Sequence, residues 1–149
     1  SCEDQEQYSR RQCLRFHGIA EGKSENTDQL VIDVVRRNLG INLDPGHIDR
    51  SHRITPRIRS SGSQKPRPII IKFSRYNTRH EIYSARSKFR GTDIFIHEDL
   101  TVNRQAIVNK LRFHENVKKV WTLDGRITAV NANGKKISIT SLADIDSKL

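Results

Sequence analysis

Several features that define other classes of protein are missing from this 149-residue sequence. Its two cysteines, Cys2 and Cys13, are too few for a disulfide scaffold or a four-cysteine zinc site, and such sparse use favours a reducing, intracellular compartment. No stretch approaches the ~20 apolar residues that a membrane span requires, and no signal peptide is recognisable. We therefore expect no membrane partner. The missing initiator methionine suggests a fragment of a longer protein.

Catalytic and metal-binding patterns are also missing. The histidines are scattered, and His47, Asp49 and His52 match no established metal-ligand spacing. Glu98 and Asp99 follow a predicted strand, where a metal-dependent nuclease would hold its metal, but no further acid supports that site, and Asp99 also suits the start of a helix. Glycine-rich phosphate loops and nucleophile motifs are absent. We predict a protein that is not an enzyme and has no cofactor, metal or small-molecule substrate.

Acidic residues are almost missing from one segment. Residues 50–90 contain twelve Lys and Arg but a single acid, Glu81, so this segment carries a net charge of +11 in a chain of net charge +10. A solvated charged surface is the ordinary alternative, but such surfaces alternate in sign. We therefore predict a binding surface for a polyanion. The candidate cations are Arg50, Arg53, Arg57, Arg59, Lys65, Arg67, Lys72, Arg75, Arg86 and Lys88.

Hydrophobic periodicity predicts an α+β domain over residues 13–99. Strands are expected at 13–18, 48–54, 68–73 and 93–97, because apolar and polar residues alternate or short apolar runs lie between turn signals. Helical spacing predicts one helix from the cap at Asn26 or Thr27 to Gly40, and a second over 76–89. Residues 55–66 are predicted to form a mobile basic loop. The order βαββαβ is that of ferredoxin-like domains such as RNA-recognition motifs.

One face of the predicted sheet is a candidate binding site. If the apolar set that includes Leu14, Phe16 and Ile71 forms the core, strand alternation places a mixed set on the opposite face. RNA-recognition motifs carry two or three base-stacking aromatic residues on that face. Here we expect weaker stacking and more phosphate contact, and the alternative is a merely solvated polar face. The residues on this face are Arg15, His17, Ile70, Lys72, Phe95 and His97.

Residues 100–149 are predicted to form a small α+β domain that contains a β-hairpin and meander. Thr101 caps its first helix, and Asp124-Gly125 is a preferred type I′ turn. The two-residue turn places Trp121, Arg126 and Thr128 on one face, where the indole and the guanidinium group can stack a base. Trp121 as the anchor of a small core is the alternative.

Five blocks of the chain closely resemble, in the same order, the first-open-reading-frame protein of LINE-type non-LTR retrotransposons. They are RRQCLRFHGI (10–19), IDRSHR (48–53), KPRPIIIKF (65–73), EDLT (98–101) and VWTLDGRI (120–127), and the resemblance extends from about residue 8 to residue 142. Related domains occur in the baculovirus few-polyhedra protein and in host proteins derived from such elements.

The resemblance implies an RNA-recognition-like domain and a C-terminal domain that bind single-stranded RNA or DNA. It also implies a homotrimer formed through an N-terminal coiled coil that is missing from this fragment, so that residues 1–12 are a linker or the end of that coiled coil. The family coats its own transcript in cytoplasmic ribonucleoprotein particles with nuclear access, and acts as a nucleic-acid chaperone in retrotransposition. By motif, the resemblance assigns nucleic-acid contacts to Arg15, Arg67, Arg86, Lys88 and Arg104.

We therefore expect a single-stranded nucleic-acid-binding module of a LINE-type element. The alternative from a different class is a protein-interaction scaffold of the viral few-polyhedra or domesticated host kind. A metal-dependent nuclease is the third possible function.

Overall fold

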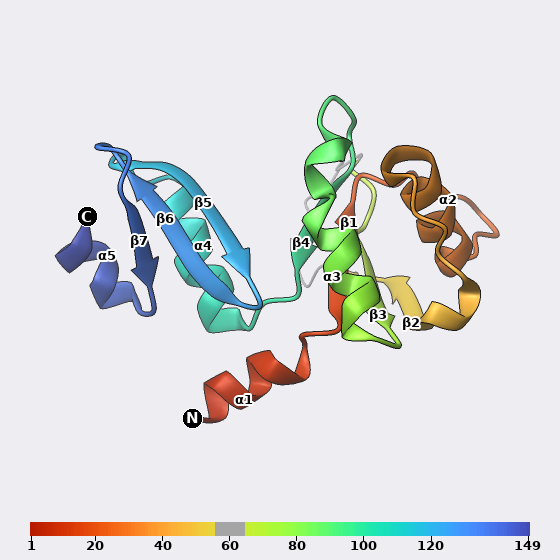
Figure 1. Cartoon of the computed structure of the whole chain (residues 1–149), viewed down its shortest axis with the longest axis horizontal. Coiled ribbons are helices and arrows are strands. Elements are labelled where there is room, and N and C mark those ends of the chain that lie inside the picture. The colour runs from red at the N-terminus through yellow and green to blue at the C-terminus, as the bar shows by residue number, and fades with distance from the viewer. Residues whose placement is uncertain (56–64) are drawn as a thin grey trace. The chain divides into compact units, whose positions relative to one another are not determined.

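The computed structural model describes residues 1–55 and 65–149. The chain forms two compact units (Figure 1): the first unit is Gln12–Asp99, and the second combines Ser1–Arg11 with Leu100–Leu149. The described residues form five α-helices and two antiparallel sheets of four and three strands, so the predicted α+β class is confirmed. The predicted loop at 55–66 falls mostly on 56–64, and Arg57 and Arg59 lie outside the described residues.

The first unit contains a four-stranded sheet, two α-helices and two 3₁₀ helices. The sheet order is β2-β3-β1-β4, and every neighbouring pair is antiparallel. The elements are, in chain order, β1 (Cys13–His17), α2 (Thr27–Leu39), η1 (Pro45–His47), β2 (Ile48–Arg53), β3 (Ile69–Phe73), α3 (Tyr76–Ser84), η2 (Arg86–Phe89) and β4 (Phe95–Glu98).

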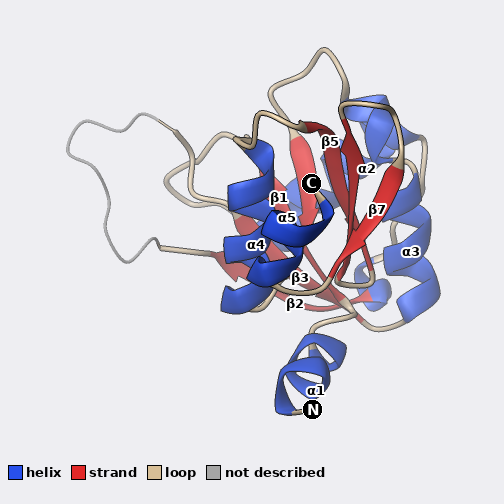
Figure 2. Cartoon of the chain, turned by 90° about the vertical axis from the view of Figure 1, so that its left-hand side faces the viewer, coloured by secondary structure: helices blue, strands red, loops and turns tan. Residues whose placement is uncertain are grey.

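Period-two alternation determines which face of this sheet is buried. Leu14 and Phe16 of β1 are fully buried, and so are the alternate residues of β3. They pack against the apolar residues of α2, α3 and η2, which therefore lie on the same face of the sheet. Figure 2 distinguishes the helices from the strands. Helix α2 has the predicted ends, because the Asn26 side chain accepts a hydrogen bond from the Gln29 amide and Gly40 adopts φ 70°.

The helix predicted over 76–89 is interrupted. The α-helix α3 ends at Ser84, and the chain continues as the 3₁₀ helix η2, a tightening that is common at helix C-termini. Ile82 and Phe89 remain buried in the core. Arg79 of α3 is also buried, at 1% exposure, and forms an ion pair with the equally buried Glu98 of β4. One of the twelve cations of the basic segment is therefore inside the domain.

The second unit contains a three-stranded antiparallel sheet in the order β5-β6-β7. The turn between β5 and β6 is the predicted type I′ turn, since Asp124 and Gly125 have φ values of 50° and 77°. The core of this unit consists of aliphatic residues from α4, α5 and one face of the sheet. The elements are α1 (Cys2–Ser9), α4 (Val102–Arg112), β5 (Val117–Leu123), β6 (Arg126–Asn131), β7 (Lys136–Ile139) and α5 (Leu142–Lys148).

Helix α1 is an integral part of the second unit. Gln7 is buried, and its Oε1 accepts a hydrogen bond of 2.9 Å from the backbone N–H of Thr101. Arg104 of α4 forms ion pairs with Glu3 and Asp4 at 3.0 and 2.8 Å. The segment for which the sequence suggested a linker or the end of a coiled coil is thus a short helix, fixed by side chains about a hundred residues away in the chain.

Candidate nucleic-acid interface

The four-stranded sheet has one face that the helices of its own unit do not cover, which we call the open sheet face. Cross-strand pairing places Arg15 beside Ile70 and His97, and His17 beside Phe95. Every member of the predicted set is at least partly exposed, whereas the alternating residues are buried. The predicted face is confirmed in its membership, and pairing with β3 adds Arg50 and His52 to it.

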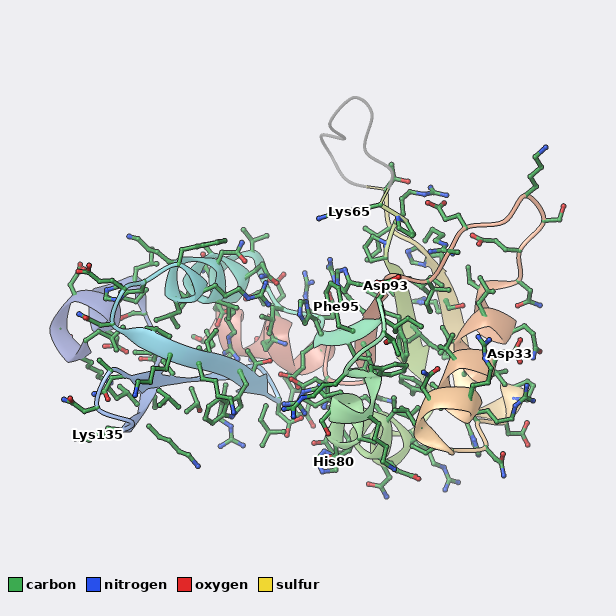
Figure 3. The ribbon with its side chains drawn as sticks, turned by 90° about the horizontal axis from the view of Figure 1, so that it is seen from above. Asp33, Lys65, His80, Asp93, Phe95 and Lys135 are labelled. Atoms are coloured by element: carbon green, nitrogen blue, oxygen red, sulfur yellow. The ribbon has the colours of Figure 1, made fainter. Side chains whose placement is uncertain are left out.

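Three aromatic rings gather at one end of the open sheet face, and we call them the ring cluster. The rings of His17 and Phe95 stack in parallel, with centroids 4.6 Å apart and an interplanar angle of 3°. His97 lies 4.9 Å from His17 and 5.0 Å from Phe95 at tilted angles. Phe95 is 48% exposed (Figure 3). The sequence prediction counted only the phenylalanine, but imidazole rings also stack on bases.

Two of the cations on the open sheet face have acidic neighbours. The Nε and Nη2 atoms of Arg15 donate to Oδ1 of Asp99 at 3.0 and 2.8 Å, and this aspartate is buried. Lys72 lies 3.8 Å from Asp49, a loose pair at an exposed position. Arg50 is exposed on the same face. The face therefore offers one exposed cation, one loosely paired cation and one cation neutralised by a buried carboxylate.

Two predicted cations have a structural role instead. Arg53 lies three residues after Arg50, so strand alternation turns it to the helix-covered side, where its side chain is 5% exposed. It donates to both carboxylate oxygens of Glu25 and to the carbonyl groups of three residues, which uses all five N–H groups of the guanidinium. Arg67 binds Glu21 through its backbone and its side chain, and this bonding holds the pKa of Glu21 at about 2. Both guanidinium groups are thus engaged in bonds within the first unit.

The remaining predicted cations of the first unit are distributed around it. Arg86 and Lys88 belong to η2, which packs on the covered face of the sheet. The Arg86 guanidinium lies 4.0 Å from the centroid of the Tyr83 ring and donates to the Tyr83 carbonyl. Arg75 is exposed at the start of α3, and Lys65 is exposed before β3. Arg86 and Lys88 therefore belong to the helix-covered side of the sheet and not to the face of the ring cluster.

The second unit carries a basic face of its own. The predicted pairs are confirmed: Trp121 lies opposite Thr128, and Leu123 lies opposite Arg126. Trp121 is not part of the core, so the alternative in which it anchors that core is wrong. Lys136 Nζ lies 5.8 Å from the centroid of the Trp121 ring. Arg104, by contrast, is committed to Glu3, Asp4 and the Gly125 carbonyl, which gives it a structural role.

The excess positive charge, which lies in one segment of the sequence, is shared between the two folded units. The first unit contains 16 basic and 10 acidic residues, a net charge of +6, and the second contains 11 and 7, a net charge of +4. Acids from outside residues 50–90 pair with the basic segment, as Glu21, Glu25 and Glu98 do. Within the residues that the structure describes, the basic segment is therefore not one continuous cationic site.

Residues 1–55 and 65–149 contain no group of three His, Cys, Asp or Glu side chains suited to holding a metal ion. Within the same residues, every helix is too short or too polar to cross a membrane.

No protein-family model matches the sequence, and no curated protein matches it significantly.

Proposed function

We propose that the first unit is an RNA-recognition-motif-like domain that binds single-stranded nucleic acid on its open sheet face. The element order βαββαβ and the antiparallel strand order β2-β3-β1-β4 support a ferredoxin-like fold of this kind. The single observation that carries the proposal is the ring cluster. Aromatic rings on the sheet face that the helices leave uncovered are the stacking platform of such domains.

The proposed mode of binding combines stacking with phosphate contact. An unpaired base stacks on Phe95, which His17 supports from within the cluster. Arg50 and Lys72 pair with each other on β2 and β3, across the open sheet face from Phe95 on β4 and two rows of that face along the strands. A ligand of several nucleotides would cross the face from the rings to these cations. Because the ligand is held mainly by its phosphates and by the faces of its bases, we expect little sequence preference and a marked dependence on salt.

The biological setting that we propose follows from the five sequence blocks. In this setting the chain is a non-enzymatic module of a LINE-type retrotransposon ribonucleoprotein, which coats the element's RNA, acts as a nucleic-acid chaperone and trimerises through a coiled coil outside these residues. The net charges of +6 and +4 on the two units support a polyanionic partner for each of them.

Substitution of Phe95 by alanine tests the proposal. One stacked base contributes about 1–3 kcal/mol, so we expect the Kd for a fluorescein-labelled oligouridine to rise about 5- to 150-fold, measured by fluorescence anisotropy. Phe113→Ala is the matched control, since this phenylalanine is 90% exposed and lies in α4's C-cap, outside the open sheet face. Its affinity should equal that of the wild type.

Two outcomes contradict the proposal. Equal affinities for the Phe95→Ala variant and the wild type would remove the ring cluster from the interface. If the wild type binds no oligonucleotide at micromolar concentration, nucleic-acid binding itself is refuted, and the protein-interaction scaffold becomes the preferred function. The stacking of Phe95 on His17 contributes about 0.5–1.5 kcal/mol to stability, which Phe95→Ala removes. Circular dichroism therefore serves to check that both variants are folded.

A further inference from the structure

The three-stranded sheet of the second unit also has a face without a helix, which we call the Trp121 face. Strand pairing arranges it in three rows: Lys119 with Val130 and Lys136, Trp121 with Thr128 and Ser138, and Leu123 with Arg126. The intervening rows contain the buried residues of the core, such as Ile127 and Ile139. Alternation thus places the aliphatic core on one side of the sheet and a single aromatic ring on the other.

Packing does not account for the position of Trp121. A tryptophan in a small domain ordinarily supplies a large share of the buried apolar area. In this unit the hydrophobic core, from Leu100 to Ile145, consists of aliphatic side chains, and Trp121 lies on the other side of the sheet, partly exposed. The largest apolar side chain of the unit is therefore directed away from its core.

The charge around Trp121 specifies the ligand. Lys119, Arg126 and Lys136 lie on this face, and the face contains no acidic residue among its eight positions. Three cations around one flat ring complement a polyanion that presents unpaired bases, because the bases stack on the indole while the phosphates meet the cations. A duplex buries the faces of its bases and offers no such surface.

We propose that the Trp121 face is a second binding surface for single-stranded nucleic acid. The inference rests on the proposed function for the class of ligand, but it depends on other residues in the other unit. Lys119 and Lys136 are the residues that the sequence prediction missed. The sequence contained a signal for Lys119, because residues 119 and 121 fall on the same face of a strand.

The only tryptophan in the chain makes this surface directly observable. We would titrate the whole chain with an oligouridine of about 16 nucleotides and record the intrinsic emission of Trp121, together with the anisotropy of a labelled oligonucleotide. Stacking should quench the indole emission. In the Phe95→Ala variant the quenching should persist, although the total affinity falls, because the ring cluster belongs to the other unit.

Two further variants identify the contacts. Trp121→Ala should weaken binding by a further 5- to 150-fold in the Phe95→Ala background, about what one stacked base contributes, while Trp121→Phe should retain most of it. Lys136→Gln should reduce the slope of log K against log salt by about 0.7, the contribution of one phosphate contact on a single strand. Lys110→Gln is its matched control, because Lys110 is an exposed lysine on α4 of the same unit; its slope should not change.

The readouts separate this inference from the proposed function. If the oligonucleotide binds without quenching Trp121, and Lys136→Gln behaves like Lys110→Gln, the second surface is refuted while the ring cluster stands. If quenching occurs and Phe95→Ala has no effect, the second surface stands and the ring cluster is refuted. If neither anisotropy nor emission changes, both are refuted.

Discussion

Removal of the Asp99 charge should strengthen the binding of nucleic acid. In the wild type, Asp99 accepts two hydrogen bonds from Arg15 and neutralises it on the open sheet face. Asp99→Asn keeps the shape and an acceptor oxygen but removes the negative charge, so the positive charge of Arg15 becomes available to a phosphate. The test therefore looks for a gain in affinity for nucleic acid rather than a loss.

The expected gain follows from counterion release. On single strands log K falls by about 0.7 per phosphate contact for each log unit of salt, so one additional contact is worth about eightfold at 50 mM salt relative to 1 M. We therefore expect about an eightfold lower Kd at low salt, a slope steeper by about 0.7 and nearly equal affinities near 1 M salt. The substitution also weakens charge-assisted hydrogen bonds at a buried carboxylate and should destabilise the fold by about 1.5–3 kcal/mol.

Anisotropy titrations of a labelled oligouridine between about 50 mM and 1 M salt measure this effect. Asp33→Asn is the control, because it changes the net charge by the same amount on α2, well separated from Phe95 in Figure 3. A general effect of net charge would change both variants alike. An Asp99→Asn protein that is folded but binds with unchanged affinity and slope would show that Arg15 does not contact the ligand.

Three further predictions concern stability. Glu98→Gln should lower the free energy of unfolding, measured in urea, by about 3–5 kcal/mol, because it removes the negative charge that pairs with the buried Arg79. Substitution of both residues by leucine should cost less than the sum of the two single changes. The pKa of Glu21 is lowered from 4.5 to about 2, so its ion pair stabilises the fold above pH 4.5 and this contribution is lost as the pH falls towards 2. The difference in unfolding free energy between the wild type and Glu21→Gln should therefore shrink over that range. A difference that stays constant with pH would contradict this prediction. Gly125→Ala should destabilise the protein by more than Gly134→Ala. Both glycines have positive φ, a conformation that costs an L-residue about 1–2 kcal/mol, but only at Gly125 would the new Cβ overlap side chains, including that of Gln7 in α1. Equal losses of stability would argue against the docking of α1.

Local patterns predicted the elements of this fold well, because each signal depends on neighbouring residues. Alternation in β1 and β3 identified both faces of the first sheet, and Asn26 and Gly40 marked the ends of α2. The Asp124-Gly125 turn fixed the register of the hairpin, and with it the face that Trp121 occupies. The interruption of α3 was not predicted, since the apolar spacing of residues 82–89 suits an α-helix as well as a 3₁₀ turn.

The site was predicted less well, because ion pairs join residues far apart in the chain. Nothing local indicates that Glu25 will meet Arg53 or that Asp99 will meet Arg15. One signal was nevertheless present: if Arg50 lies on the open face of a strand, then Arg53 cannot, because three residues is an odd number of steps.

The separation of paired from exposed cations clarifies what the high net charge can do. A cation paired with a carboxylate contributes little field beyond the Debye length, about 8 Å at physiological salt, so long-range attraction reflects the net charge of each unit rather than the count of its arginines. That attraction raises the rate of encounter with any polyanion. In the proposed function, retention of the ligand depends instead on groups that touch it. Each sheet face offers an aromatic ring and cations: Phe95 on β4 with Arg50 and Lys72 across the same face in the first unit, and Trp121 beside Lys119 and Lys136 in the second. Because single strands but not duplexes expose the faces of their bases, the proposal assigns the selection of the single strand to the rings rather than to the charge.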